Sequence, residues 1–109
     1  MRRPLITLTT DFGTADGYAA QVKGVLRGLV PEAVIDDLSH DLPPHDVLAG
    51  ALFLESVIPR YPEDSIHVAV VDPGVGTARR GMVINWRNRM IVGPDNGLFT
   101  LLLRAEPAA

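Results

Sequence analysis

An aspartate and an arginine near the middle of the sequence have the types and spacing to do chemistry together. Asp72 follows the apolar run at 68–71, which is typical of a strand buried on both faces, and Pro73 with Gly74 ends that strand. Open α/β sheets bind ligands at the carboxyl ends of their strands, where Asp72 is expected. Arg79, seven residues later, can turn back toward the carboxylate. The pair is either a site that orients a water molecule or a structural ion pair, and the spacing fits both.

The loop at 10–17, Thr-Asp-Phe-Gly-Thr-Ala-Asp-Gly, brings two more carboxylates. Asp11 can accept hydrogen bonds from the hydroxyls of a ribose, or it can bond backbone donors of its own turn. Asp16 is placed to cap the helix predicted after it and to complement the positive end of the helix dipole. The loop lacks the spaced glycines of a phosphate-binding turn and contains no lysine. A neutral or cationic ligand therefore suits it better than a phosphate.

Three histidines and one asparagine are weaker candidates. His40 and His45 flank the Pro-Pro pair at 43–44 and can line a site, although histidines in loops are more often solvated. His67 lies inside a predicted strand and is expected to be structural. Asn96, in Pro-Asp-Asn-Gly, can face a ligand or simply close a turn. No cluster of residues has the spacing of a metal site, so we expect no bound metal.

The elements that must position these side chains alternate between strands and helices. Strands are predicted at 5–10, 33–35, 66–71, 82–86 and 90–92, and helices at 18–29, 46–58 and from 98 to 103. The second strand delivers Asp36 and Asp37 to its end. The last two strands are expected to form a hairpin, since only three polar residues separate them. This order predicts a single α/β domain over 1–109, with a mostly parallel open sheet and flanking helices.

Composition excludes several classes of protein. The 109 residues carry a formal net charge of −3, which gives no basic surface for nucleic acid. Cysteine is absent, so disulfides and thiolate metal sites are impossible. No apolar run is long enough to span a membrane, and the N-terminus has no signal-peptide core. A cytoplasmic protein with no membrane partner is the expectation.

Four motifs occur in an order that resembles a known family. They are Thr-Asp-Phe-Gly-Thr-Ala-Asp-Gly-Tyr, Ser-His-Asp-Leu-Pro-Pro-His-Asp-Val, Asp-Pro-Gly-Val-Gly-Thr-Ala-Arg-Arg and Pro-Asp-Asn-Gly-Leu. Together they are similar to the adenosine-forming S-adenosylmethionine hydrolases, also called S-adenosylmethionine hydroxide adenosyltransferases, which are related to fluorinase and chlorinase. The resemblance runs from Leu5 to about Leu103 and no single motif carries it.

The resemblance implies a reaction and roles for four residues. Water attacks the ribose C5′ of S-adenosylmethionine and releases adenosine and L-methionine, with no cofactor besides the substrate. Asp72 and Arg79 match two members of a catalytic Asp-Arg-His set that positions the water. Asp11 matches the carboxylate that binds the ribose hydroxyls, and Asp16 matches an acidic residue near the methionine end. Halide-using relatives carry an uncharged residue at the position of Asp72, so water is the expected nucleophile and halide the alternative.

The family also has parts that the four motifs do not cover. Its N-terminal α/β domain runs further than this chain and is followed by a β-barrel domain, and the catalytic histidine lies in that further part. The family's sites form between neighbouring subunits of a homotrimer. The resemblance therefore implies an incomplete N-terminal domain with half of a site, and activity that is weak or absent in this chain alone. The alternatives are a non-catalytic module that binds adenosine or S-adenosylmethionine, and an oligomerising domain whose apolar C-terminal helix docks on a partner.

Overall fold

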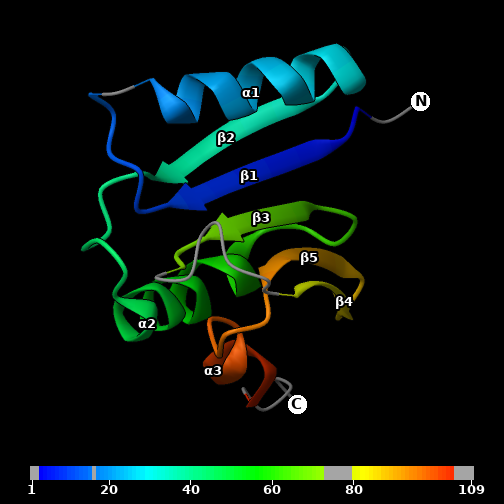
Figure 1. The fold of residues 1–109 in the computed structure, drawn as a ribbon. Helices are drawn as coiled ribbons and strands as arrows, with labels where there is room; N and C mark the ends of the chain where they lie inside the picture. Colours follow the sequence, from blue (N-terminus) through cyan, green and yellow to red (C-terminus); the bar gives the residue numbers. More distant parts are fainter. Residues whose placement is uncertain (1–2, 16, 73–79, 105–109) are drawn as a thin grey trace.

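The computed structural model describes residues 3–15, 17–72 and 80–104 of the chain (Figure 1). The elements follow in the order β1 Leu5–Thr10, α1 Tyr18–Leu29, β2 Val34–Ser39, α2 Val47–Val57, the 3₁₀ turn η1 Ile58–Arg60, β3 Ile66–Val70, β4 Gly81–Trp86, β5 Arg89–Pro94 and α3 Thr100–Arg104. Strands and helices alternate as the apolar patterning predicts. Within the described ranges, no helix is long and apolar enough to cross a bilayer.

The five strands form one sheet in the order β2-β1-β3-β5-β4. Strands β1, β2, β3 and β5 run parallel, whereas β4 pairs antiparallel with β5 through a short turn. The turn residues Arg87 and Asn88 both have positive φ, 50° and 64°, as a two-residue hairpin turn requires. The predicted mostly parallel open sheet and its terminal hairpin are confirmed.

The helices cover opposite faces of this sheet (Figure 1). Alternate residues of β3 and β5, such as Ala69 and Ile91, pack with Leu54 and Ile58 from α2 and η1 in the main hydrophobic core. Helix α1 lies on the other face, where its Lys23 contacts a side chain of β2. Because successive side chains of a strand point to opposite faces, the two helical layers contact different residues of each strand.

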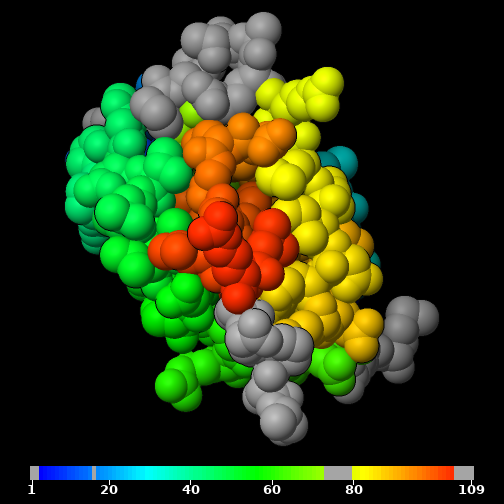
Figure 2. All heavy atoms as spheres, turned by 90° about the horizontal axis from the view of Figure 1, so that it is seen from below, coloured from blue at the N-terminus to red at the C-terminus, as the bar shows by residue number. Residues whose placement is uncertain are grey.

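Helix α3 completes the core, although it begins at Thr100 rather than at the predicted 98. Figure 2 shows this orange-red segment seated between α2 in green and β4 in yellow. Phe99 and Leu102 are buried there, while Leu103 is 45% exposed. Gly93 of β5 allows this packing, since a Cβ at that position would collide with the Ala69 carbonyl and would lie 2.6 Å from the Phe99 ring.

Strand β2 is longer than predicted and contains the two aspartates that the sequence pattern placed at its end. It spans Val34–Ser39, so Asp36 and Asp37 pair with β1 inside the strand. An edge strand tolerates carboxylates when each finds a partner. Asp36 accepts a hydrogen bond from the Tyr61 hydroxyl at 3.2 Å, and Asp37 is bonded to the Lys23 ammonium. Contacts with distant residues overrode the local preference of these carboxylates for a turn.

Helix α1 has the predicted bounds but does not bury its apolar stripe. Tyr18, Val25 and Leu29 are 55%, 62% and 74% exposed, and among the described residues of this helix only Ala19 is buried. The residue that caps its N-terminus is Gly17, with φ of 78° and no side-chain cap. The predicted cap, Asp16, lies outside the described residues.

His67 is structural, as the sequence pattern predicts. Its ring is buried between two hydroxyls, with the Thr7 oxygen 2.7 Å from Nδ1 and the Ser65 oxygen 2.8 Å from Nε2. The Ser65 hydroxyl donates its own hydrogen to the Pro62 carbonyl at 2.6 Å, so it must accept from Nε2–H. Nδ1 then accepts from Thr7, which fixes one neutral tautomer. Burial first, and the charge of Arg89 second, lower the pKa of His67 to about 4.

Candidate functional site

A pocket opens where β1 and β3 end side by side. Its volume is about 610 Å³ and its described lining residues are Asp11, Phe12, Tyr18, Gln21, Val22, His45 and Asp72. Parallel strands carry their following loops to the same edge of a sheet, which is why residues far apart in the sequence meet here. The structure therefore brings three of the predicted site residues, Asp11, His45 and Asp72, to one pocket.

Asp11 ties the first loop to the loop that precedes α2. One of its carboxylate oxygens accepts a hydrogen bond from the backbone N–H of His45 at 2.6 Å. Gly13, two residues later in the same turn, has φ of 72° and donates its N–H to the His40 carbonyl at 2.7 Å. Both contacts join the end of β1 to the chain that leaves β2. The carboxylate is thus held at the pocket wall by backbone contacts.

His45 has a backbone conformation that most residues avoid. Its φ is 62°, in the left-handed region, which costs a residue with a Cβ about 1 kcal/mol. This conformation lets its N–H reach Asp11, and the residue itself lines the pocket. Asp46, immediately after it, caps α2 by accepting a hydrogen bond from Ala49 N–H at 2.9 Å.

Asp72 lies at the base of the pocket, next to the core. It is only 7% exposed, and the preceding residue, Val71, is fully buried. Asp72 also borders a second hollow of about 370 Å³, which is lined by the ends of β3, β4 and β5. A buried carboxylate that faces two hollows is suited to hold a water molecule or a cation.

Asn96 braces the end of β3 and is not among the described residues that line the pocket. Its Nδ2 donates to the Val71 carbonyl at 2.9 Å, and its Oδ1 accepts from Leu98 N–H at 3.1 Å. Arg79, the predicted partner of Asp72, and Asp16, the second acid of the first loop, lie outside the described residues. The predicted Asp72–Arg79 pair therefore stays a prediction.

The sequence reasoning missed the apolar wall of the pocket. Phe12 and Tyr18 meet edge to face with ring centroids 6.3 Å apart, and Val22 follows one helical turn after Tyr18. The spacing of Tyr18 and Val22 on the first turns of a helix that follows the acidic loop was the available clue.

His40 was also misjudged, since the sequence pattern favoured a solvated loop residue. It is 7% exposed and bonded through both ring nitrogens, to Thr10 and to Asp37. Asp37 lies only three residues before His40, but nothing local to the motif Ser-His-Asp reveals the contact with Thr10, which is 30 residues away.

The lining has the chemistry of a site for a cationic ligand with a flat apolar part. Two carboxylates, Asp11 and Asp72, face the pocket, and two aromatic rings form part of its wall. Carboxylates attract a cation and accept hydrogen bonds from hydroxyls, whereas aromatic faces favour a planar ring. Within the described residues, no group of three histidine, aspartate or glutamate side chains gathers to hold a metal ion.

The sequence matches one protein family along almost its full length. Residues 6–109 match the SAM hydroxide adenosyltransferase N-terminal domain. The chain belongs to this family.

Curated relatives carry two enzyme names. An (R)-S-adenosyl-L-methionine hydrolase of Salinispora arenicola is 52% identical over 95 residues, which are 87% of this chain and 36% of that enzyme. The enzyme of the same name from Thermus thermophilus is 48% identical over 105 residues, or 96% of this chain and 40% of its own length. A fluorinase of Nocardia brasiliensis is 31% identical over 126 residues, covering 94% of this chain and 42% of that enzyme. The chain thus spans well under half the length of these adenosyltransferase-family relatives.

Two crystal structures share the fold. A conserved hypothetical protein from Thermus thermophilus superposes with a TM-score of 0.78 at 46% identity, over 92% of this chain and 41% of that one. An uncharacterized conserved protein from Thermotoga maritima gives a TM-score of 0.85 at 33% identity, over 89% of this chain and 38% of that one.

Proposed function

We propose that the pocket between Asp11 and Asp72 binds S-adenosylmethionine and that water displaces methionine from C5′ of its ribose. The observation that carries the proposal is the meeting of these two carboxylates at one pocket in a chain of the adenosyltransferase family. Relatives named (R)-S-adenosyl-L-methionine hydrolase at 46–52% identity support the same reaction. The sulfonium and ammonium charges of this substrate suit the acidic lining.

Each of the two carboxylates has its own role in the reaction. Asp11 accepts hydrogen bonds from the ribose hydroxyls and so fixes the sugar. Asp72 orients a water molecule whose oxygen attacks C5′. The C5′–S bond breaks, its electron pair goes to sulfur, and methionine leaves as a neutral thioether without a general acid. The water proton passes to Asp72 or to solvent, and no metal or other cofactor takes part.

By the same family likeness, two further residues receive proposed roles. Arg79 pairs with Asp72 and holds its carboxylate in one orientation, since a guanidinium can bond both carboxylate oxygens. Asp16 lies toward the methionine end and attracts its ammonium group.

Water is favoured over halide because of the charge on Asp72. A buried carboxylate repels an anion, and little solvent screens it when the residue is 7% exposed. The fluorinase relative is the weaker match, at 31% identity against 52% for the hydrolase. We therefore assign halide transfer as the second candidate reaction.

The test is to incubate the purified protein with S-adenosylmethionine in ¹⁸O-labelled water and to measure adenosine and methionine by chromatography and mass spectrometry. We expect small but equal amounts of both products, with ¹⁸O in the 5′-hydroxyl of adenosine, since the resemblance implies weak activity in this chain alone. Adding chloride or fluoride should give no 5′-halogenated adenosine. A halogenated product, or adenosine without ¹⁸O, contradicts the proposal.

Two matched variants test the assignment of Asp72. Asp72→Asn keeps the shape of the side chain but removes its charge, and we expect it to lower the hydrolysis rate by at least about a hundredfold. Glu32→Gln removes one charge from an exposed carboxylate before β2, at the opposite edge of the sheet, and should leave the rate unchanged. Equal rates for Asp72→Asn and the unmodified protein rule out the role given to Asp72.

We also propose that the protein works in the cytoplasm as a homo-oligomer, a trimer by resemblance to the family. The pocket supports the oligomer, because its described lining comes from one side only, from loops and α1 at a single edge of the sheet. Sedimentation equilibrium, with and without S-adenosylmethionine, measures the mass. A monomer in both conditions contradicts the oligomer.

A further inference from the structure

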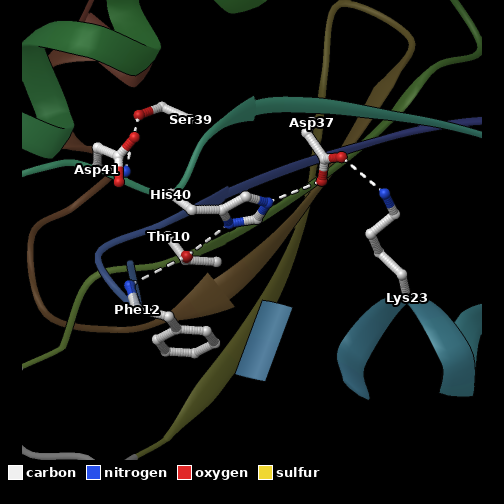
Figure 3. A network of polar contacts seen from close by, with 7 residues as sticks. All are labelled: Thr10, Phe12, Lys23, Asp37, Ser39, His40 and Asp41. Atoms are coloured by element: carbon white, nitrogen blue, oxygen red, sulfur yellow. Dashed lines mark hydrogen bonds and ion pairs between the residues drawn. The ribbon is translucent and has the colours of Figure 1, made fainter. Parts of the chain in front are cut away.

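A network of polar contacts surrounds His40 (Figure 3), buried at Thr10 and His40, with the Lys23 and Asp37 side chains 34% and 38% exposed. The hydroxyl oxygen of Thr10 is 2.7 Å from His40 Nδ1, and Asp37 Oδ1 is 2.7 Å from His40 Nε2. The Lys23 ammonium donates to the other oxygen of Asp37 at 2.8 Å. Thr10 and His40 are 2% and 7% exposed. The network thus joins β1, the end of β2 and α1.

The donors and acceptors of this network can be assigned from its outer end inward. Lys23 first, and His40 second, hold the pKa of Asp37 below its usual value, so this carboxylate is an acceptor. His40 Nε2 must therefore carry the proton that points at Asp37. In the neutral ring Nδ1 is then an acceptor, and the Thr10 hydroxyl donates to it. The lone pairs of the Thr10 oxygen stay available, and one of them accepts the backbone N–H of Phe12 at 3.2 Å.

The contacts of Thr10 with His40 and with Phe12 reach the turn that carries Asp11. Thr10 precedes Asp11, and Phe12 follows it, so the hydroxyl that His40 orients holds both neighbours of the carboxylate. The backbone carbonyl of His40 also accepts the Gly13 N–H at 2.7 Å. One buried residue therefore fixes the turn at three positions around Asp11. His40 itself is not among the described residues that line the pocket.

We propose that His40 is a positioning residue that orients Asp11 toward the ribose hydroxyls through the Thr10 hydroxyl. The inference rests on the proposed function for the identity of the ligand, while the fixing of the turn stands on the hydrogen bonds alone. The acceptor at Nδ1 is the atom that matters, because it sets the direction of the Thr10 hydroxyl. The contact of Nε2 with Asp37 selects the tautomer that makes Nδ1 an acceptor.

Two amide substitutions of His40 test the roles of its two ring nitrogens separately. His40→Asn places a carbonyl oxygen close to the position of Nδ1, so it can still accept from Thr10 but cannot reach Asp37. His40→Gln places an amide nitrogen close to Nε2, so it can still donate to Asp37 but offers Thr10 no acceptor. Circular dichroism and the thermal midpoint establish that each variant is folded before binding is measured.

The decisive measurement compares adenosine with 2′,3′-dideoxyadenosine by titration calorimetry. The unmodified protein should prefer adenosine, and Asp11→Ala should lose that preference. We expect His40→Gln to lose at least about tenfold in affinity for adenosine but almost nothing for the dideoxy compound, and His40→Asn to stay within about threefold of the unmodified protein for both. This pattern places the effect on the ribose hydroxyls.

Two results overturn the inference. Equal losses for both nucleosides in His40→Gln reduce His40 to a structural residue, and so does a His40→Asn variant that is as impaired as His40→Gln. If the unmodified protein does not distinguish the two nucleosides, the proposed function fails, and the ribose part of the inference with it. Hydrogen exchange then still decides the turn: the Phe12 amide should exchange faster in His40→Gln than in His40→Asn, and equal exchange refutes the positioning role.

Discussion

The side-chain amide of Asn96 donates a hydrogen bond to the carbonyl oxygen of Val71, 2.9 Å away, across 25 residues of sequence. Val71 is fully buried and immediately precedes Asp72. The side-chain oxygen of Asn96 accepts the N–H of Leu98, at the entry to α3. A single turn residue therefore joins the end of β3 to the end of β5, and the position of Asp72 depends on it.

Replacing Asn96 should destabilise the fold and loosen Asp72. Asn96→Ala leaves the Val71 carbonyl without this donor, and we expect a loss of about 1–2 kcal/mol in the free energy of unfolding. Asn96→Asp keeps an acceptor for the Leu98 N–H but places a carboxylate against the Val71 carbonyl oxygen. Its free energy of unfolding should therefore fall at least as far as that of Asn96→Ala. Urea unfolding measures both. A variant as stable as the unmodified protein contradicts the bracing role.

Gly93 should tolerate no larger side chain. A Cβ there meets the Ala69 carbonyl and the Phe99 ring, both held in the core, so Gly93→Ala should cost about 3 kcal/mol or prevent folding. Gly24→Ala is the matched control. Gly24 lies in α1 with no atom within 4 Å of the added methyl group, and alanine favours the helix by about 0.5–1 kcal/mol. The thermal midpoint should fall in the first variant and rise in the second.

Stability should decrease in acid because of His67. The pKa of His67 is lowered to about 4 in the folded protein, against about 6.5 in the unfolded chain, so the unfolded state binds more protons between these values. The neutral ring therefore contributes its full stability above pH 6.5 and loses it as the pH falls toward 4. Between pH 7 and pH 4.5 we expect a loss of about 2 kcal/mol from this residue.

A variant isolates the His67 contribution from that of the carboxylates, which also titrate in acid. His67→Gln has no group that titrates in this range, so the difference in unfolding free energy between pH 7 and pH 4.5 should be smaller by about 2 kcal/mol than in the unmodified protein. Urea unfolding of both proteins at both pH values supplies the four free energies. An unchanged difference contradicts the assignment.

The sequence predicted the elements whose preferences are local. The apolar run before Asp72 marked a strand and the pattern at 46–58 marked a helix, and both occur close to the predicted positions. The loop that carries Asp11 was singled out by its two carboxylates and by the family resemblance. These features depend on periodicity and on the backbone limits of a few residue types.

What the sequence could not predict depends on contacts between distant residues. Asp37 stays in a strand because Lys23 and His40 bond its carboxylate, and Lys23 is 14 residues away on α1. His40 is buried for the same reason. The apolar stripe of α1 follows helical spacing, yet Val25 and Leu29 remain exposed, since periodicity shows that a face exists and not what covers it.

His45 should separate the role of a backbone amide from that of a side chain. Its N–H, not its ring, holds Asp11, and its φ of 62° suits glycine better than histidine. His45→Gly should therefore keep adenosine affinity within about threefold and raise the free energy of unfolding by up to about 1 kcal/mol. His45→Pro removes the N–H and cannot adopt this φ, so it should lose both binding and stability. Calorimetry and urea unfolding measure the pair. A tenfold loss of adenosine affinity in His45→Gly would show instead that the imidazole itself contacts the ligand.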